Sequence, residues 1–166
     1  MTCILPLVAC KEKIPDPITE TPIYWGEASV VLNGTPNALR SAALIYDGKI
    51  NLHLEFQIIP NYRRYGIGIS KLPQETGIYY PVIHTIDEEE PNFLFDWPSG
   101  DAVLAFYDLM QDSSLIVEIK EFDPATKDIS GTYSGEFVKN TPELINGSPD
   151  TVRMEHGIFK TKISGQ

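Results

Sequence analysis

The sequence predicts an all-β fold, an antiparallel β-sandwich of about eight to nine strands, with a closed β-barrel as the alternative. Apolar and polar residues alternate in several segments, which is the pattern of strands with one buried face. Short runs of this kind are separated by turn residues such as Asp-Gly and Asn-Gly. Of the 166 residues, 42% are apolar and 22% charged, which is typical of a single globular domain large enough to form its own core.

The clearest strand pair is predicted at residues 42–58. The segment NLHLEFQI alternates apolar with polar residues, and His53 lies on its polar face. Its apolar face consists of Leu52, Leu54, Phe56 and Ile58. Asp47-Gly48 stands just before this segment, and such a pair suits a type I′ turn, in which both central residues have positive φ. We therefore expect a β-hairpin here.

Further strands are expected along the rest of the chain. In SSLIVEIKEF, Leu115, Val117 and Ile119 are expected to face inward, and Glu118 and Lys120 outward. One segment has an alternative, because Thr35-Pro36 could begin a short helix that runs through Ser41. The remaining predicted strands are Tyr24–Leu32, Arg64–Ser70, Gly77–Ile86, Ala102–Leu109, Ser114–Phe122, Gly131–Val138 and Val152–Ile163.

A second hairpin is predicted from FDPATKDISGTYSGEF, Phe122 to Phe137. Asp123 and Thr126 can cap its turn by accepting hydrogen bonds from backbone N–H groups. Gly131 and Gly135 allow a β-bulge, or the close approach of a neighbouring side chain. The same segment is expected to place Tyr133, Gly135 and Phe137 on one side of its second strand.

The N-terminal segment Leu7-Val8-Ala9-Cys10 resembles the bacterial lipobox, which implies that Cys10 is lipidated and becomes the first mature residue. Residues 1–9 are then interpreted as a remnant signal peptide, 10–22 as a Pro-containing tether, and 23–166 as one β-sandwich domain. The apolar run before Cys10 is short and has no basic residue ahead of it. A start upstream of Met1 and a chance match to the lipobox therefore both stay open.

Charge limits the choice of partners. The chain has 13 Lys and Arg against 23 Asp and Glu, a net charge of −10, and an acidic surface repels nucleic acid. The expected partners are a membrane, reached through the lipid on Cys10, and a glycan or an envelope protein. We expect a monomer, and no cofactor.

Aromatic and cationic residues supply the binding candidates Tyr62, Arg63, Arg64, Tyr65, Tyr80 and Trp97. The cluster PNYRRYG could bind an anionic glycan or a protein through cation–π and bidentate contacts, or it could be a polar hairpin tip. The segment 87–101 combines carboxylates with Phe93, Phe95 and Trp97. It could bind Ca²⁺ or a sugar, or form an acidic loop that leads into a strand with a buried aromatic face.

Catalytic and metal-binding patterns are weak in this sequence. His53, His84 and His156 lack the close spacing of zinc ligands, so no metal site is expected. There is no G-x-S-x-G elbow, and the sequence alone does not place the carboxylates that glycoside hydrolysis would need. The carboxylates in question are Asp96, Asp101, Asp108 and Asp123. Enzymatic activity stays open, although the balance is against it.

The order of these features is similar to that in a family of small Bacteroidota lipoproteins that carry a domain of unknown function. Its elements here are the lipobox, the tether, Trp25 near A-x-V-x-L-N-G, the 122–137 hairpin and a final G-I-F strand. The resemblance implies an extracytoplasmic β-sandwich anchored in the outer membrane, on its periplasmic or its surface side, and it supplies no catalytic residues. The expected function is non-enzymatic binding of a glycan, peptide or envelope partner. The alternatives are an envelope hydrolase with a carboxylate-based site and a carrier of small apolar ligands.

Overall fold

The computed structural model describes residues 23–57, 64–83, 90–99, 102–111, 115–140 and 148–164. Within these ranges, the side chains at 56–57, 64–65, 96–99 and 102–104 lie outside the description. The described residues form strands and turns, with no helix among them, so the all-β prediction is confirmed.

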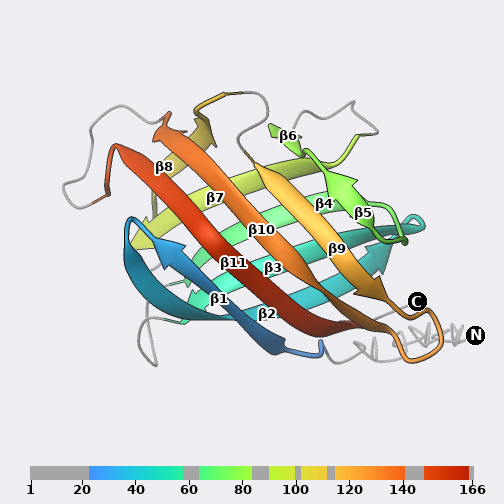
Figure 1. Ribbon diagram of the computed structural model, residues 1–166. Helices are drawn as coiled ribbons and strands as arrows, with labels where there is room; N and C mark the ends of the chain where they lie inside the picture. The colour runs from blue at the N-terminus through green and yellow to red at the C-terminus, as the bar shows by residue number, and fades with distance from the viewer. Residues whose placement is uncertain are drawn as a thin grey trace, which may run out of the picture.

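The strands form two layers that cross each other (Figure 1). In the front layer, β1, β9, β10 and β11 run diagonally, with the short β5 beside β9, and β2, β3, β4 and β7 lie behind them. This layered arrangement is sandwich-like, as predicted. The strands are β1 (Gly26–Leu32), β2 (Thr35–Tyr46), β3 (Lys49–Gln57), β4 (Arg64–Leu72), β5 (Gly77–Tyr79), β6 (Val82–Ile83), β7 (Asn92–Ser99), β8 (Ala102–Leu109), β9 (Ile116–Phe122), β10 (Asp128–Lys139) and β11 (Thr151–Ser164).

The strand pairings connect the two layers at both edges. From β2 they run through β3, β4, β7 and β8 to β10, then to β11, which pairs with β2 again. Most pairs are antiparallel, as expected, but β11 with β2 and β6 with β7 are short parallel pairs, so the sheet is mixed. Strand β9 lies outside this circuit, between β10 and the edge strand β5.

Two tight turns set the register of the first three strands. Asp47 and Gly48 have φ values of 50° and 70°, as a type I′ turn requires, and they join β2 to β3. Asn33 and Gly34, with φ values of 47° and 80°, join β1 to β2 in the same way. The hairpin predicted at 42–58 is therefore confirmed, although β2 begins earlier, at Thr35.

The alternative of a short helix from Thr35 through Ser41 is wrong. The whole segment belongs to β2, because the Asn33-Gly34 turn folds it back onto β1, where Leu32 pairs with Thr35 and Gly26 with Ser41. The predicted strand 77–86 is divided at Tyr80-Pro81 into β5 and β6. A proline has no N–H to donate to a ladder, which explains the break. This division, together with β7, gives eleven strands among the described residues instead of eight to nine.

Buried polar groups join the layers where β1, β2 and β11 meet. The hydroxyl of Ser41 donates to the carbonyls of Glu27 (3.0 Å) and Lys160 (3.2 Å), and Thr161 donates to the carbonyl of Ser41. Both side chains are buried. Their hydrogen bonds satisfy carbonyl groups that would otherwise be costly to bury at this junction.

The core lies between the two layers. The inward faces predicted for β3 and β9 are confirmed at Leu52, Leu54, Val117 and Ile119, all of them buried. The ring of Phe95 stacks on Tyr107 at 4.8 Å between centroids and meets Phe137 edge-on at 5.0 Å. Such aromatic pairs add to the free energy gained from burial alone.

The 122–137 hairpin is confirmed in detail. Oδ1 of Asp123 accepts the N–H groups of Ala125 (2.8 Å) and Thr126 (3.3 Å), and Oγ1 of Thr126 accepts that of Asp128. Tyr133, Gly135 and Phe137 point together into the core. Both ladders contain a bulge beside a glycine, but the extra residue lies on the partner strand, β9 beside Gly131 and β11 before Gly135. The close approach of a side chain is confirmed at Gly131, where the ring of Phe159 lies against the glycine.

Candidate functional site

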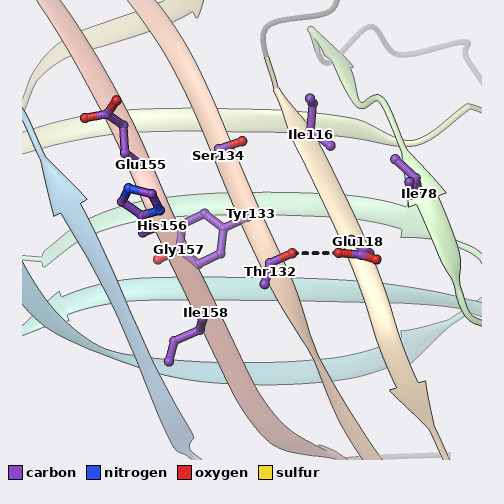
Figure 2. A pocket seen from close by; sticks show the side chains of 10 residues that line it. All are labelled: Ile78, Ile116, Glu118, Thr132, Tyr133, Ser134, Glu155, His156, Gly157 and Ile158. Atoms are coloured by element: carbon purple, nitrogen blue, oxygen red, sulfur yellow. Dashed lines mark hydrogen bonds between the residues drawn. The ribbon is translucent and has the colours of Figure 1, made fainter.

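A groove of about 560 Å³ lies on the outer surface of the front layer, over β10 (Figure 2). We call it the β10 groove. Among the depressions lined by described residues, it exceeds three others of about 270, 360 and 320 Å³. Its lining residues come from β5, β9, β10 and β11, and they are Ile78, Ile116, Glu118, Thr132, Tyr133, Ser134, Glu155, His156, Gly157 and Ile158.

The groove arises from the sizes of the outward-facing side chains. The outward positions of β10 hold the small residues Thr132 and Ser134, whereas the neighbouring strands place larger residues beside them. One row across four strands pairs Ile158 with Thr132, Thr132 with Glu118, and Glu118 with Ile78. In the next row Ser134 pairs with Ile116. Small central residues between larger flanking ones leave a channel along β10.

The walls of the groove are apolar and exposed. Ile78, Ile116 and Ile158 have exposed fractions of 56%, 38% and 54%. Figure 2 shows Ile78 and Ile116 on one side of Thr132 and Ser134, and Ile158 on the other. Single exposed apolar residues are common on protein surfaces, but three around one channel mark a surface that can be covered by a partner.

The polar groups of the groove are the carboxylates of Glu118 and Glu155, the hydroxyls of Thr132 and Ser134, and the imidazole of His156. The hydroxyl of Thr132 donates to Oε2 of Glu118 at 3.1 Å, and Nζ of Lys120 lies 3.5 Å from the same oxygen. Glu155 lies 3.9 Å from Nη1 of Arg153, beyond hydrogen-bond distance. These carboxylates can accept hydrogen bonds from a ligand.

A β-bulge positions His156 at the groove. Between the pairs Tyr133–Gly157 and Gly135–Met154, β11 has two residues opposite the single Ser134 of β10. His156 has φ of 53°, in the left-handed region that residues other than glycine rarely adopt. Its side chain is exposed. Bulges often turn a side chain toward a functional site, and backbone strain of this kind concentrates at such sites.

The floor beneath the groove is formed by a buried tyrosine. Tyr133 is buried, and its hydroxyl donates to the carbonyl of Ser29 on β1 at 3.3 Å. Burial raises the pKa of the Tyr133 hydroxyl above its usual value. Its ring occupies the space beside Gly157, the residue that follows His156. The ring of Tyr133, which forms the floor, therefore also contacts the strand at the bulge.

A second depression continues the groove along β10. It shares Ile116, Ser134 and Glu155 with the β10 groove and extends to Glu136 and Arg153. Nε of Arg153 donates to Glu136 at 2.6 Å, and this hydrogen bond raises the pKa of the arginine. The guanidinium group of Arg153 therefore lies at that end of the channel, in an ion pair with Glu136.

A separate, smaller depression, of about 270 Å³, lies on the outer surface of the back layer. It is lined by Gly66 and Gly68 of β4, with His53 and Glu55 on one side and Leu94 on the other. Glu55 accepts two hydrogen bonds from Arg40, at 2.6 and 3.0 Å. The guanidinium carbon of Arg40 lies 3.8 Å from the ring centroid of Trp25. His53 lies on the exposed polar face of its strand, as predicted.

The predicted binding residues are described only in part. Tyr80 is exposed and follows β5, but it does not line the β10 groove. The backbones of Arg64, Tyr65 and Trp97 lie in β4 and β7, paired with Gln57, Phe56 and Ala105, and their side chains are outside the description. Tyr62, Arg63 and the lipidation residue Cys10 also lie outside the described residues.

The acidic segment 87–101 is described only in part. Phe93 and Phe95 are buried in the core, so the interpretation of this strand as having a buried aromatic face is confirmed for them. Glu90 is exposed. The placement of residues 87–89, 100 and 101 and the side chains of Asp96 and Trp97 lie outside the description.

The remaining titratable residues are dispersed. His53 and His156 lie on β3 and β11, and His84 is outside the described residues. Within the part of the chain that is described, no three His, Cys, Asp or Glu side chains are arranged to hold a metal ion. Asp123 caps a turn, and the N–H groups of Ala125 and Thr126 lower its pKa. A general acid needs a raised pKa, so Asp123 does not fit that role.

The binding candidates predicted from the sequence include none of the groove residues, because the strand predictions consider only which side chains face the core. The sequence does contain an indication of the groove. Residues two apart in a strand share a face, so Ile116 lies on the same face as Glu118 and Lys120, and Ile158 on the same face as Lys160 and Lys162. An apolar residue on a charged face is a candidate contact residue. The sequence does not show that β5, β9, β10 and β11 are neighbours, which is what groups these isoleucines.

Comparison with known proteins gives no match, whether to a family model, to a curated protein or to a solved structure. In the described ranges of the chain there is no helix with the length and apolar character needed to cross a bilayer.

Proposed function

We propose that this protein is a non-enzymatic binding or accessory protein of a bacterial envelope, anchored by a lipid on Cys10, and that it binds its partner in the β10 groove. The observation that carries the binding role is the exposure of Ile78, Ile116 and Ile158 around one channel. The fold leaves these side chains uncovered although its core is well packed. A partner that covers these side chains is stabilised by the burial of their exposed apolar surface.

The size of this gain supports specific binding. Burying an isoleucine side chain completely stabilises by about 1.5–3 kcal/mol. Because the three side chains are already partly covered, a ligand would gain about 2–4 kcal/mol from them in total. Hydrogen bonds to Thr132, Ser134 and Glu118 would add specificity rather than most of the affinity.

Two observations favour binding over the alternatives. A hydrolase of the expected kind needs a carboxyl group with a raised pKa, whereas Asp123, one of the four candidate carboxylates, has a lowered pKa and caps a hairpin turn. A carrier of apolar ligands needs interior space, whereas the rings of Phe93, Phe95 and Phe137 are in contact in the core.

The membrane anchor is proposed from the sequence of residues 7–10. Multiple acyl chains on Cys10 would hold the protein firmly, since a single chain binds a membrane only marginally. We expect Cys10→Ser to abolish membrane association when the gene carries a complete signal sequence. If the variant stays in the membrane fraction, the anchor is wrong, while the binding role can still be tested on the released domain.

The groove is tested by placing a charge in it. Ile158→Arg should prevent the native partner from co-purifying with the lipidated protein from solubilised envelopes. Leu94→Arg is the matched control, since Leu94 has a similar exposed fraction, 53% against 54%, on the opposite layer. Both variants should fold, because each replaced side chain points outward. Equal recovery of the partner with both variants would exclude the groove as its binding surface.

A further inference from the structure

We propose that the ligand of the β10 groove is a basic, extended peptide segment in which apolar residues alternate with lysine or arginine. This inference rests on the proposed function, because it names the chemical class of partner for the same surface. It follows from the shape of the groove, from the chemistry of its walls and from the charge of its polar groups.

The shape favours an extended chain. The groove and the depression that continues it follow β10 from Thr132 to Glu136. Four residues of a strand span about 13 Å, so a ligand lying along β10 would place four or five extended residues in the channel. Alternate side chains of such a segment would point into the groove, and the others toward solvent.

The walls favour aliphatic contacts. The large apolar side chains around the channel are the isoleucines 78, 116 and 158, and the ring of Tyr133 is buried beneath the floor. Sugar rings bind best against flat, exposed aromatic faces, which the lining of this groove does not offer. Branched apolar side chains of a peptide can pack between isoleucines from both sides of the channel.

The charge favours a basic ligand. Both contacts of Glu118, from Thr132 and Lys120, use Oε2, so Oε1 can accept from a ligand cation. Glu155 makes only a long ion pair with Arg153, at 3.9 Å, and the closer partner of Arg153 is Glu136, so the carboxylate of Glu155 can also accept hydrogen bonds from a ligand. The whole chain carries a net charge of −10, which attracts cations over a longer range. Lysine or arginine side chains would therefore be favoured at the edges of the groove.

The test uses three soluble probes with the full mature chain. An octapeptide of alternating lysine and valine should bind in isothermal titration calorimetry, and a matched glutamate–valine octapeptide should not. Maltohexaose, a neutral oligosaccharide, represents the glycan alternative. Raising the salt concentration from 50 to 300 mM should weaken binding of the lysine peptide, because exposed charges are screened over that range.

Variants distinguish this inference from the proposed function. Glu118→Gln with Glu155→Gln should weaken binding of the lysine peptide by about tenfold, as expected for the loss of two partly exposed charge contacts. The control pair Glu27→Gln with Glu121→Gln removes the same charge outside the groove lining and should change binding by less than about twofold. Equal binding of both octapeptides, or binding of maltohexaose alone, would overturn the basic-peptide inference. Either result leaves the groove role to be decided by Ile158→Arg.

Discussion

Tyr133 of β10 and Gly157 of β11 are cross-strand partners, and the tyrosine ring fills the space where a side chain at position 157 would lie. A Cβ on Gly157 would come within 2.8 Å of Cδ1 and Cδ2 of the ring and within 2.5 Å of the Tyr133 carbonyl oxygen. The pair two positions along the ladder has the same arrangement reversed, with the ring of Phe159 over Gly131. These two ring–glycine pairs fix the register of the strands that carry the groove.

Substitution of either glycine should therefore destabilise the fold. A Cβ on Gly131 would lie 2.0 Å from the Glu118 carbonyl oxygen, so the backbone of β9 would have to move. We expect Gly131→Ala and Gly157→Ala each to lower the free energy of unfolding by about 2 kcal/mol or more, as overpacking of a core does. Urea denaturation followed by tryptophan fluorescence measures the change.

Gly68 is the matched control for these substitutions. It also lies inside a strand, but a Cβ there would meet its nearest neighbours at 3.9–4.0 Å, which is ordinary contact. We expect Gly68→Ala to leave stability unchanged or to raise it by about 0.5 kcal/mol, because alanine has less freedom in the unfolded chain. Equal losses for all three variants would mean that the ring–glycine contacts are not the cause.

The buried hydroxyl of Tyr133 should make stability depend on alkaline pH. Burial raises the pKa of this group in the folded protein, so the unfolded chain loses the proton first as the pH rises. The stabilisation is fully present below the unfolded pKa of about 10 and is lost progressively above it. Tyr133→Phe should remove this part of the pH dependence.

At neutral pH, Tyr133→Phe should lower the free energy of unfolding only slightly. It deletes the hydrogen bond to the Ser29 carbonyl, a loss of about 1 kcal/mol, and it retains the ring over Gly157. The free energies of unfolding of wild type and variant, measured between pH 7 and 11, should approach each other at the alkaline end. Parallel curves over that range would contradict the assignment of the alkaline loss to Tyr133.

The hairpin turn at Asp123 should respond to acid in the opposite direction. The N–H groups of Ala125 and Thr126 lower the pKa of Asp123, and a lowered pKa means that stability is present above the unfolded value of about 3.9 and is lost below it. Asp123→Ala should be less stable than wild type at pH 7, and the difference should be smaller at pH 2, where the protonated carboxyl accepts the two N–H groups more weakly. Thermal unfolding at both values measures the difference.

Asp123→Asn is the matched variant for the turn. Its amide oxygen can still accept the two backbone N–H groups, but it does not titrate. It should keep more of the stability of wild type at pH 7 than Asp123→Ala does. A change of its melting temperature with acid as steep as that of wild type would show that other carboxylates cause the loss.

His156 should be replaceable by glycine with a gain in stability. Its φ of 53° is strained for histidine and accessible to glycine without steric cost. We expect His156→Gly to raise the free energy of unfolding by about 0.5–1 kcal/mol. His156→Ala, which keeps the strain and removes the imidazole, should bring no gain. A loss of stability in the glycine variant would mean that the imidazole itself holds the bulge.

The strand pattern could be predicted from local sequence because each strand has one buried face. The alternation at Leu52 and Leu54, and the turn at Asp47-Gly48, are each decided by residues close together in the chain. The capped turn at Asp123 is local in the same sense. Because each of these features is determined by residues close together in the chain, it can be predicted from the sequence.

Long-range pairing explains what the sequence does not reveal. Thr35-Pro36 is a helix start by local rules, and only the pairing of β2 with β1 makes it a strand. The groove likewise depends on the row that brings Ile158, Glu118 and Ile78 together from three distant segments. The sequence indicates that each isoleucine lies on the solvent-facing side of its strand. Their proximity depends on which strands are neighbours in the folded sheet, and the sequence does not show this.

The most direct test of the binding surface is site-specific photo-crosslinking of the lipidated protein in intact cells. A photoreactive residue at position 158 or 116 should yield a crosslinked adduct, and the same residue at position 94 of β7 or 106 of β8, both exposed and outside the groove lining, should not. Crosslinks at 158 and 116 to one common partner are the predicted result. Adducts formed from 94 and 106 but absent at 158 and 116 would contradict the assignment of the β10 groove as the binding site.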